Sequence, residues 1–178
     1  GSDNSKANLK PSTDGSANGV DKVIVQTVSG LKSYYYVDIP GTLEGWFDGA
    51  ASAGDTVLNY ADGLYVQTLP GSTATDFVIV GAVKVSETAS VLKPGFNLLS
   101  AVTPAGLTLG TCGLEAYIAP STDGSSNGAD ILLIPNPLEP GSFSSYYYVN
   151  IPGTLEAWFD GANVADDIAL EGAFFLNN

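Results

Sequence analysis

The sequence predicts an all-β protein made of two related lobes, each a β-sandwich or a barrel-like sheet. One reason is a near-identical block that occurs twice, at residues 33–50 and 145–162, with differences at Asp38/Asn150 and Gly45/Ala157. Such a duplication indicates that each copy is one structural unit. The other reason is that apolar runs are short, are cut by Gly, Pro, Asn and Asp, and show no helical period.

The two copies match beyond this block, but they differ in what precedes them. Residues 55–58 align with 167–170, and residues 63–66 align with 172–175. A strand-rich segment leads into the second copy, whereas a short polar stretch precedes the first. We therefore expect a first lobe at 1–72 that lacks N-terminal strands and a second lobe at 73–178 that has them.

Two arrangements of the intervening strands follow from this difference. In one, both lobes share these strands in a single intramolecular sheet. In the other, the first lobe keeps an open edge that another subunit fills by strand addition.

The expected strands are runs of β-branched, aromatic or leucine residues bounded by turn residues. In the first copy they are 23–28, 34–39, 42–47, 56–59 and 64–69. In the second copy they are 131–134, 146–151, 154–159, 167–170 and 173–176. Between the copies they are 77–85, 91–92, 96–100, 107–109 and 115–118.

Pro-Gly pairs at 40–41 and 152–153 predict a reversal between two strands in each copy. Proline presets φ at the first central turn position, and glycine permits a positive φ at the second. Because side chains alternate along a strand, Tyr34 and Tyr36 should share one face and Tyr35 the other.

Composition excludes several classes of partner. The formal charge of −13 repels nucleic acid and anionic lipid, so neither is expected to bind. No apolar run approaches the roughly 20 residues that a membrane-spanning helix needs. Charged residues make up 14% of the chain, and Gly, Ser, Thr, Ala and Asn fill the polar positions, which favours a secreted or cell-surface protein.

The inventory of reactive side chains predicts that the chain is not an enzyme. Histidine is absent and Cys112 is the single cysteine, which excludes His-based relays, an intrachain disulfide and a Cys-based zinc site. Glu44 and Asp48, repeated as Glu156 and Asp160, are paired carboxylates of the kind that a glycosidase uses. Their presence in both copies favours a role in the repeated scaffold.

A repeated acidic loop is the candidate calcium site. Residues 14–21 and 123–130 place side-chain oxygens at loop positions 1, 3 and 5 and glycine at position 6, as a Ca²⁺ loop does. Position 12, however, falls on Val25 and Ile134 instead of glutamate. The alternative is a loop in which Asp and Asn side chains hydrogen-bond the backbone. The candidate ligands are Asp14, Ser16, Asn18 and Asp21, with Asp123, Ser125, Asn127 and Asp130 in the second copy.

Aromatic residues of the repeated strands are candidates for an interface or a glycan-stacking platform. They are Tyr34, Tyr36, Trp46, Tyr146, Tyr148 and Trp158. Aromatic faces can stack on sugar rings, but packing in a core or an interface is the favoured interpretation.

Several segments carry a family resemblance. Gly-Phe-Asn-Leu-Leu at 95–99, Leu-Thr-Leu at 107–109, a Trp-containing strand and the closing residues 170–176 follow one pattern. This pattern resembles the "G-x-N-L … L … W … L-x-x-G-x-x-F" of uncharacterised secreted β-repeat proteins of environmental bacteria. The resemblance implies a secreted β-repeat fold and no particular activity.

Together, these features predict an extracellular structural protein that assembles with copies of itself into a surface filament, fibre or sheath. Subunits would join by β-strand addition, and an interface of that kind generates an open polymer unless its rotation closes a ring. Calcium is the one cofactor suggested. The alternative is a carbohydrate-binding or adhesion module that uses the Tyr and Trp strands.

Overall fold

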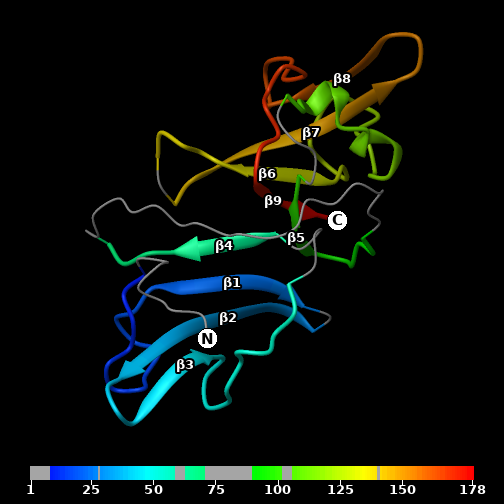
Figure 1. Cartoon of the computed structure of the whole chain (residues 1–178). Coiled ribbons are helices and arrows are strands. Elements are labelled where there is room, and N and C mark those ends of the chain that lie inside the picture. Colours follow the sequence, from blue (N-terminus) through cyan, green and yellow to red (C-terminus); the bar gives the residue numbers. More distant parts are fainter. Residues whose placement is uncertain (1–8, 28, 59–62, 71–89, 102–105, 140) are drawn as a thin grey trace. The chain divides into compact units, whose positions relative to one another are not determined.

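The computed structural model describes residues 9–27, 29–58, 63–70, 90–101, 106–139 and 141–178. Their strands form two separate antiparallel sheets of four and five strands (Figure 1). One compact unit comprises Gly1–Asn59 with Leu64–Ser86, and the other comprises Tyr60–Gly63 with Glu87–Asn178. The prediction of two β lobes is confirmed, while the predicted boundary at 72/73 lies outside the described residues.

The first sheet has the order β3-β2-β1-β4. Its strands are β1 (Lys22–Thr27), β2 (Gly30–Ile39), β3 (Leu43–Phe47) and β4 (Leu64–Gln67). The predicted Pro-Gly reversal joins β2 to β3, with Gly41 at a φ of 72°. The amide of Thr42 donates to the carbonyl of Ile39 at 3.0 Å and closes this turn.

The second sheet has the order β5-β9-β6-β7-β8. Its strands are β5 (Phe96–Ser100), β6 (Ile131–Pro135), β7 (Phe143–Ile151), β8 (Leu155–Phe159) and β9 (Ala173–Asn177). Strands β6 to β9 repeat β1 to β4, and β5 adds an edge strand beside β9. In the described part of the chain, β5 therefore extends the second sheet and is not shared with the first.

The strand register corrects one alignment that the sequence suggested. Val66 pairs with Val23 in the first sheet, and Leu176 pairs with Leu132 in the second. Val66 is thus the counterpart of Leu176, one residue further along than the sequence alignment of 63–66 with 172–175 placed it. A shift of one residue exchanges the two faces of a strand, so burial of Leu176 in the core selects this register.

Five expected strands are wrong. They are the described part of 56–59, together with 91–92, 107–109, 115–118 and 167–170. The segment 107–118 instead contains the 3₁₀ turns η2 (Leu109–Thr111) and η3 (Leu114–Ala116), because Gly110 and Gly113 interrupt it. Residues 56 and 168 close turns by donating to the carbonyls of Ala53 and Ala165, and Ala169 forms an isolated bridge with Thr108. The expected strand at 77–85 lies outside the described residues.

Strand β2, an inner strand of the first sheet that we call the central strand (its counterpart in the second lobe is β7), is buried on both faces over Tyr34–Val37. Tyr34 packs in one cluster with Leu9, Val23 and Val25. Tyr35 lies on the opposite face, in a cluster with Val20 and Val37. The predicted alternation of the tyrosines is confirmed, and both faces are apolar because each has its own cover.

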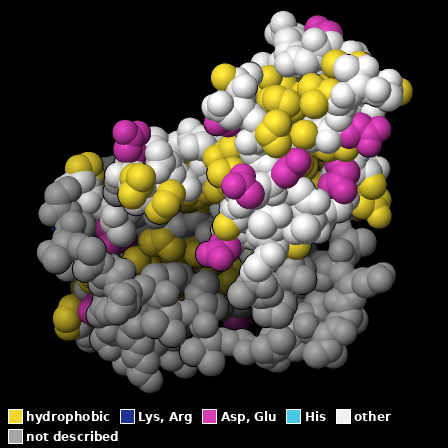
Figure 2. Space-filling view, turned by 90° about the horizontal axis from the view of Figure 1, so that it is seen from above, with side chains coloured by type: hydrophobic (Ala, Val, Ile, Leu, Met, Phe, Trp, Pro, Cys, Tyr) yellow, Lys and Arg dark blue, Asp and Glu magenta, His cyan; other side chains and the backbone are white. Residues whose placement is uncertain are grey.

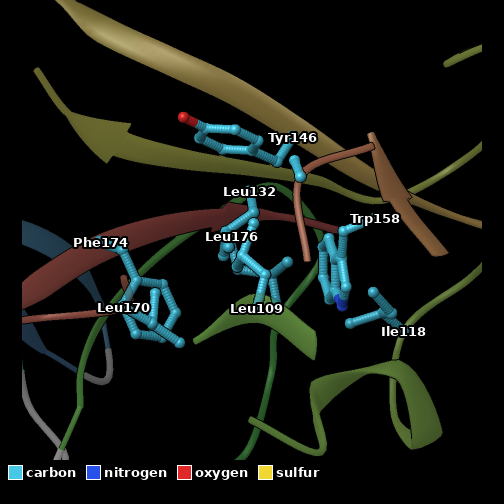
Figure 3. Close-up of a cluster of buried hydrophobic side chains, with 9 residues drawn as sticks. Leu109, Ile118, Leu132, Tyr146, Trp158, Leu170, Phe174 and Leu176 are labelled. Atoms are coloured by element: carbon cyan, nitrogen blue, oxygen red, sulfur yellow. The ribbon is translucent and has the colours of Figure 1, made fainter. Parts of the chain in front are cut away.

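The second lobe has a larger core, centred on Leu109 (Figure 3). Its buried members are Leu109, Ile118, Leu132, Tyr146, Trp158, Ala165, Leu170, Phe174 and Leu176. Figure 3 shows Leu109 between Leu170, Leu176 and Trp158, beneath strands of the sheet. The segment that precedes the second copy thus contributes the centre of the core.

The same face of the first lobe is less completely covered. Leu170 is 3% exposed, whereas its counterpart Leu58 is 50% exposed. Trp158 is buried, whereas its counterpart Trp46 is half-buried. Two copies of nearly the same sequence therefore differ in closure, by which we mean how completely this apolar face is covered. The difference lies on the face that Leu109 fills in the second lobe.

Truncating these two matched leucines should have different costs. Leu170→Ala should lower the free energy of unfolding by about 2–5 kcal/mol, because it removes buried methyl groups and leaves a cavity. Leu58→Ala should change it by less than about 0.5 kcal/mol, because the side chain is largely in solvent. Urea unfolding of both variants checks this, and equal losses would contradict the difference in closure.

Candidate functional site

The repeated acidic loop begins with a serine that is fastened to the central strand. The amide of Ser12 donates to the carbonyl of Tyr36 at 2.7 Å, and the amide of Asp38 donates to the carbonyl of Ser12 at 2.8 Å. These bonds form a parallel bridge between Ser12 and Val37. The same two bonds join Ser121 to β7, at 2.7 and 2.8 Å. In each lobe the loop therefore starts as a one-residue addition to the sheet.

The first aspartate of each loop holds the turn that follows. In the second copy, Oδ1 of Asp123 accepts from the amide and the hydroxyl of Ser125, both at 2.8 Å. The Ser121 hydroxyl donates to the same oxygen at 3.2 Å. These bonds favour the charged carboxylate and lower its pKa, with the Ser125 amide as the largest cause. Asp14 accepts from the Ser16 amide in the same way, and its pKa is lowered too.

The last aspartate of each loop is buried and joins separate segments. Asp21 accepts from the amide of Lys10 at 2.7 Å and from the amide of Leu69 at 3.0 Å. Asp130 accepts from the amide of Ala119 at 2.8 Å. A buried carboxylate needs such donors, because desolvation of an unpaired charge is costly. These two aspartates therefore close the base of the loop.

The loop contacts support the backbone-bonded alternative to a calcium site. In each copy the two aspartates serve different sets of protein donors. Among the described residues, no group of three or more His, Cys, Asp or Glu side chains is placed to share an ion. Figure 2 shows acidic side chains spread over the described part of one face. Calcium binding stays a prediction.

The calcium prediction has a direct test. An ion that binds the folded chain and not the unfolded one raises the melting temperature. If the loops bind calcium, the melting temperature should fall on addition of EDTA and recover when excess Ca²⁺ is restored. Differential scanning calorimetry in Mg²⁺ in place of Ca²⁺ is the control, and an unchanged melting temperature throughout would contradict calcium binding.

A tyrosine that the sequence did not single out ties each loop down. The hydroxyl of Tyr35 lies 3.1 Å from the carbonyl oxygen of Gly15 and 2.7 Å from that of Gly49. The hydroxyl of Tyr147 lies 3.1 Å from the Gly124 oxygen in the second loop. A hydroxyl has one proton, so the two carbonyls share one donor. The sequence signal for this role is the alternation of side chains along the strand. It places Tyr35 on the face opposite Tyr34 and Tyr36, so Tyr35 must contact whatever covers that face.

The aromatic candidates on the other face are mainly core residues. Tyr34, Tyr36, Tyr146 and Trp158 are buried, while Trp46 and Tyr148 are half-buried. The rings of Tyr36 and Trp46 meet edge to face at 5.5 Å, and those of Tyr148 and Trp158 lie 5.6 Å apart. Such contacts stabilise a core. A sugar platform needs exposed ring faces, so this burial lends no support to glycan binding at these residues.

The paired carboxylates have contacts of a structural kind. The Tyr36 hydroxyl donates to Oε1 of Glu44 at 2.9 Å, and Asp48 forms an ion pair with Lys32. Asp160 accepts from the amide of Asn163 at 2.9 Å and caps the turn after β8. These contacts support a scaffold role for the repeated carboxylates.

An acidic group around Tyr148 contains two carboxylates that sequence reasoning missed, Glu115 and Asp166. Burial raises the pKa of its hydroxyl, and the nearby charges of Glu156, Glu115 and Asp166 raise it further. Asp166 also accepts from the amide of Trp158 at 2.8 Å, so it is part of the packing around the core. Glu115 lies in the segment before the second copy, and Asp166 has a glycine, Gly54, at its counterpart position, which is why the repeat did not reveal them.

Comparison with protein-family models, with curated proteins and with solved structures finds no match for this chain. No helix in the described ranges is long and apolar enough to cross a membrane.

Removing the tyrosine hydroxyl should weaken the fold modestly. Tyr147→Phe should lower the free energy of unfolding by about 1 kcal/mol, because a buried hydrogen bond is lost while the ring stays packed. The matched control is Tyr117→Phe in the same lobe, since that side chain is 79% exposed. Urea unfolding should show no change for this control, and equal effects of both variants would rule out the anchoring role of Tyr147.

Acid should destabilise the loops through Asp123. Its pKa in the folded chain lies below the ordinary 3.8, so its contribution to the free energy of unfolding is fully present at pH values above 3.8. The contribution is lost as the pH falls through the lowered folded value. Asp123→Asn should therefore flatten the dependence of unfolding free energy on pH between 7 and 2.5, measured by urea titration. Asp55→Asn is the control, because that exposed carboxylate accepts no hydrogen bond in the described structure, and an equal flattening there would contradict the role of the loop.

Proposed function

We propose that this chain is a structural subunit of an extracellular filament, fibre or sheath, in which copies join through β-strand addition. The observation that carries the proposal is the unequal closure of the two copies. The second lobe fills its core with a preceding segment of the same chain, whereas the corresponding face of the first lobe remains partly open. An exposed apolar face beside an unpaired backbone edge is suited to receiving a strand from another chain.

The contrast extends over several matched positions. Leu170, Trp158 and Ala165 are buried, while their counterparts Leu58, Trp46 and Ala53 are half-buried or exposed. Covering such side chains stabilises by about 25 cal/mol for each Å² of apolar surface removed from water. A neighbouring subunit that covers this face would thus gain the energy that the second lobe obtains within its own chain.

The repeated loops support a scaffold role. In both lobes they fasten the second face of the central strand through buried serines and a tyrosine hydroxyl. Hydrogen bonds of this kind hold a lobe in one geometry, which a repeating assembly requires. The formal charge of −13 opposes close association at low salt.

Assembly should therefore depend on salt and on Leu58. Concentrated protein should form ordered fibres as ionic strength rises, seen by negative-stain microscopy and light scattering. Leu58→Asp should abolish them, because it places a charge on the open face. Leu138→Asp is the control, since Leu138 is 88% exposed in the other lobe, and it should leave assembly unchanged.

The proposal fails if the purified chain remains monomeric across salt and Ca²⁺ conditions. It also fails if the Leu58 and Leu138 variants assemble equally well.

A further inference from the structure

Each acidic loop carries an Asn-Gly pair, at residues 18–19 and 127–128, and these are the two such pairs of the chain. Asparagine is a chemically labile residue. The backbone nitrogen of the following residue can attack the carbonyl carbon of its side chain and close a five-membered ring. Glycine at the following position leaves this nitrogen unhindered, because it has no side chain. The chemistry is therefore easiest at these two places in the chain.

The groups that must react are accessible in both loops. Asn18 and Gly19 are exposed, and so are Asn127 and Gly128. In the described part of the chain, neither glycine amide donates a hydrogen bond, and neither asparagine side chain has one. Apart from the adjacent residues, no heavy atom lies within 4 Å of the place where a Cβ would stand on either glycine. The fold thus leaves room for the ring to close.

The Asp-Gly pairs of the same loops are protected from this reaction. The carboxylate of Asp123 accepts from the amide of Ser125 at 2.8 Å, and this bond lowers its pKa. A charged carboxylate resists attack, because it has no neutral leaving group. The amide of Gly124 is also occupied, since it donates to the hydroxyl of Ser121 at 3.0 Å. Hydrogen bonding therefore separates the aspartates of the loop from its asparagine.

Other asparagines of the described chain are held or blocked. Asn97 is buried, and its side-chain amide donates to the carbonyl of Lys93 at 2.8 Å. The side chain of Asn163 donates to Asp160 at 3.3 Å, and a valine follows it. Asn136 precedes a proline, which has no N–H to give up. These residues serve as internal references.

We propose that Asn18 and Asn127 are sites of spontaneous deamidation in the folded protein. The backbone nitrogen of Gly128 forms a bond to Cγ of Asn127 and gives up its proton. The bond between Cγ and Nδ2 breaks, and the side-chain nitrogen leaves as ammonia with that proton. Water then opens the resulting succinimide at either carbonyl carbon, which yields aspartate or isoaspartate. Asn18 reacts with Gly19 in the same way.

The modification changes the charge of the protein and keeps its fold. Each event adds one carboxylate to a chain whose formal charge is already −13. The second loop stays anchored on both sides of the site, through the Tyr147 hydroxyl at Gly124 and through Asp130 at Ala119. The chain therefore becomes more acidic with age without the action of an enzyme. This inference goes beyond the proposed function and does not depend on it.

The test follows the full chain over time at mildly alkaline pH, where the attacking amide loses its proton more readily. Isoelectric focusing should show a falling isoelectric point, and peptide mapping should find a mass gain of about 1 Da at Asn18 and at Asn127. The rate at Asn127 should lie within about tenfold of the rate in the same chain unfolded in urea, because one weak hydrogen bond closes the turn around it. Asn97 and Asn163 should remain unmodified over the same period.

Matched variants identify the source of the charge change. A chain with both Asn18→Gln and Asn127→Gln should keep its isoelectric point, because glutamine would have to close a larger ring. Asn163→Gln is the control, since this exposed asparagine lies outside the loops, and it should acidify as fast as the original chain. The proposal is refuted if the folded chain reacts at these sites more than about tenfold more slowly than the unfolded one. Equal acidification of the double variant would refute it as well, and fibre formation bears on neither outcome.

Discussion

The structure depends on covering both faces of one long apolar strand in each lobe. A strand of three tyrosines and a valine cannot leave either face in water without a large loss of hydrophobic stabilisation. One face is covered by the repeated acidic loop, which is bonded to the strand through Ser12 or Ser121 and through the hydroxyl of Tyr35 or Tyr147. Because this cover lies within each repeat, it is the same in both lobes.

The other face is where the copies diverge. In the second lobe, Leu109 occupies the space enclosed by Trp158, Leu170 and Leu176 (Figure 3). This leucine lies outside the repeated block. In the first lobe the matched side chains Leu58 and Trp46 are more exposed than Leu170 and Trp158, which supports the proposal that another chain covers them.

Much of the fold follows from local sequence alone. The duplication, the Pro-Gly reversals and the alternating tyrosines predict the hairpins β2–β3 and β7–β8, because turn chemistry and strand period act within a few residues. The leucines of segment 107–118 suggest strands, but its glycines bend it into the 3₁₀ turns η2 and η3. Its partner edge at 166–170 lies far along the chain, and periodicity carries no information about such pairing.

The candidate site was predictable to a similar degree. The repeated loop was identified from its spacing, and Asp14 and Asp123 do organise it. A pattern of oxygens at alternate positions serves a cation or the backbone equally well, and separating the two requires the positions of the donors. The roles of Tyr35 and Tyr147 depend on which face the loop covers, which only the assembled lobe reveals.

The unequal closure of the two copies is tested most directly by amide exchange in the unmodified monomer at low concentration. The Leu170 amide should exchange only with opening of its lobe, while the Leu58 amide should exchange orders of magnitude faster. Equal protection of Leu58 and Leu170 in the monomer would contradict it.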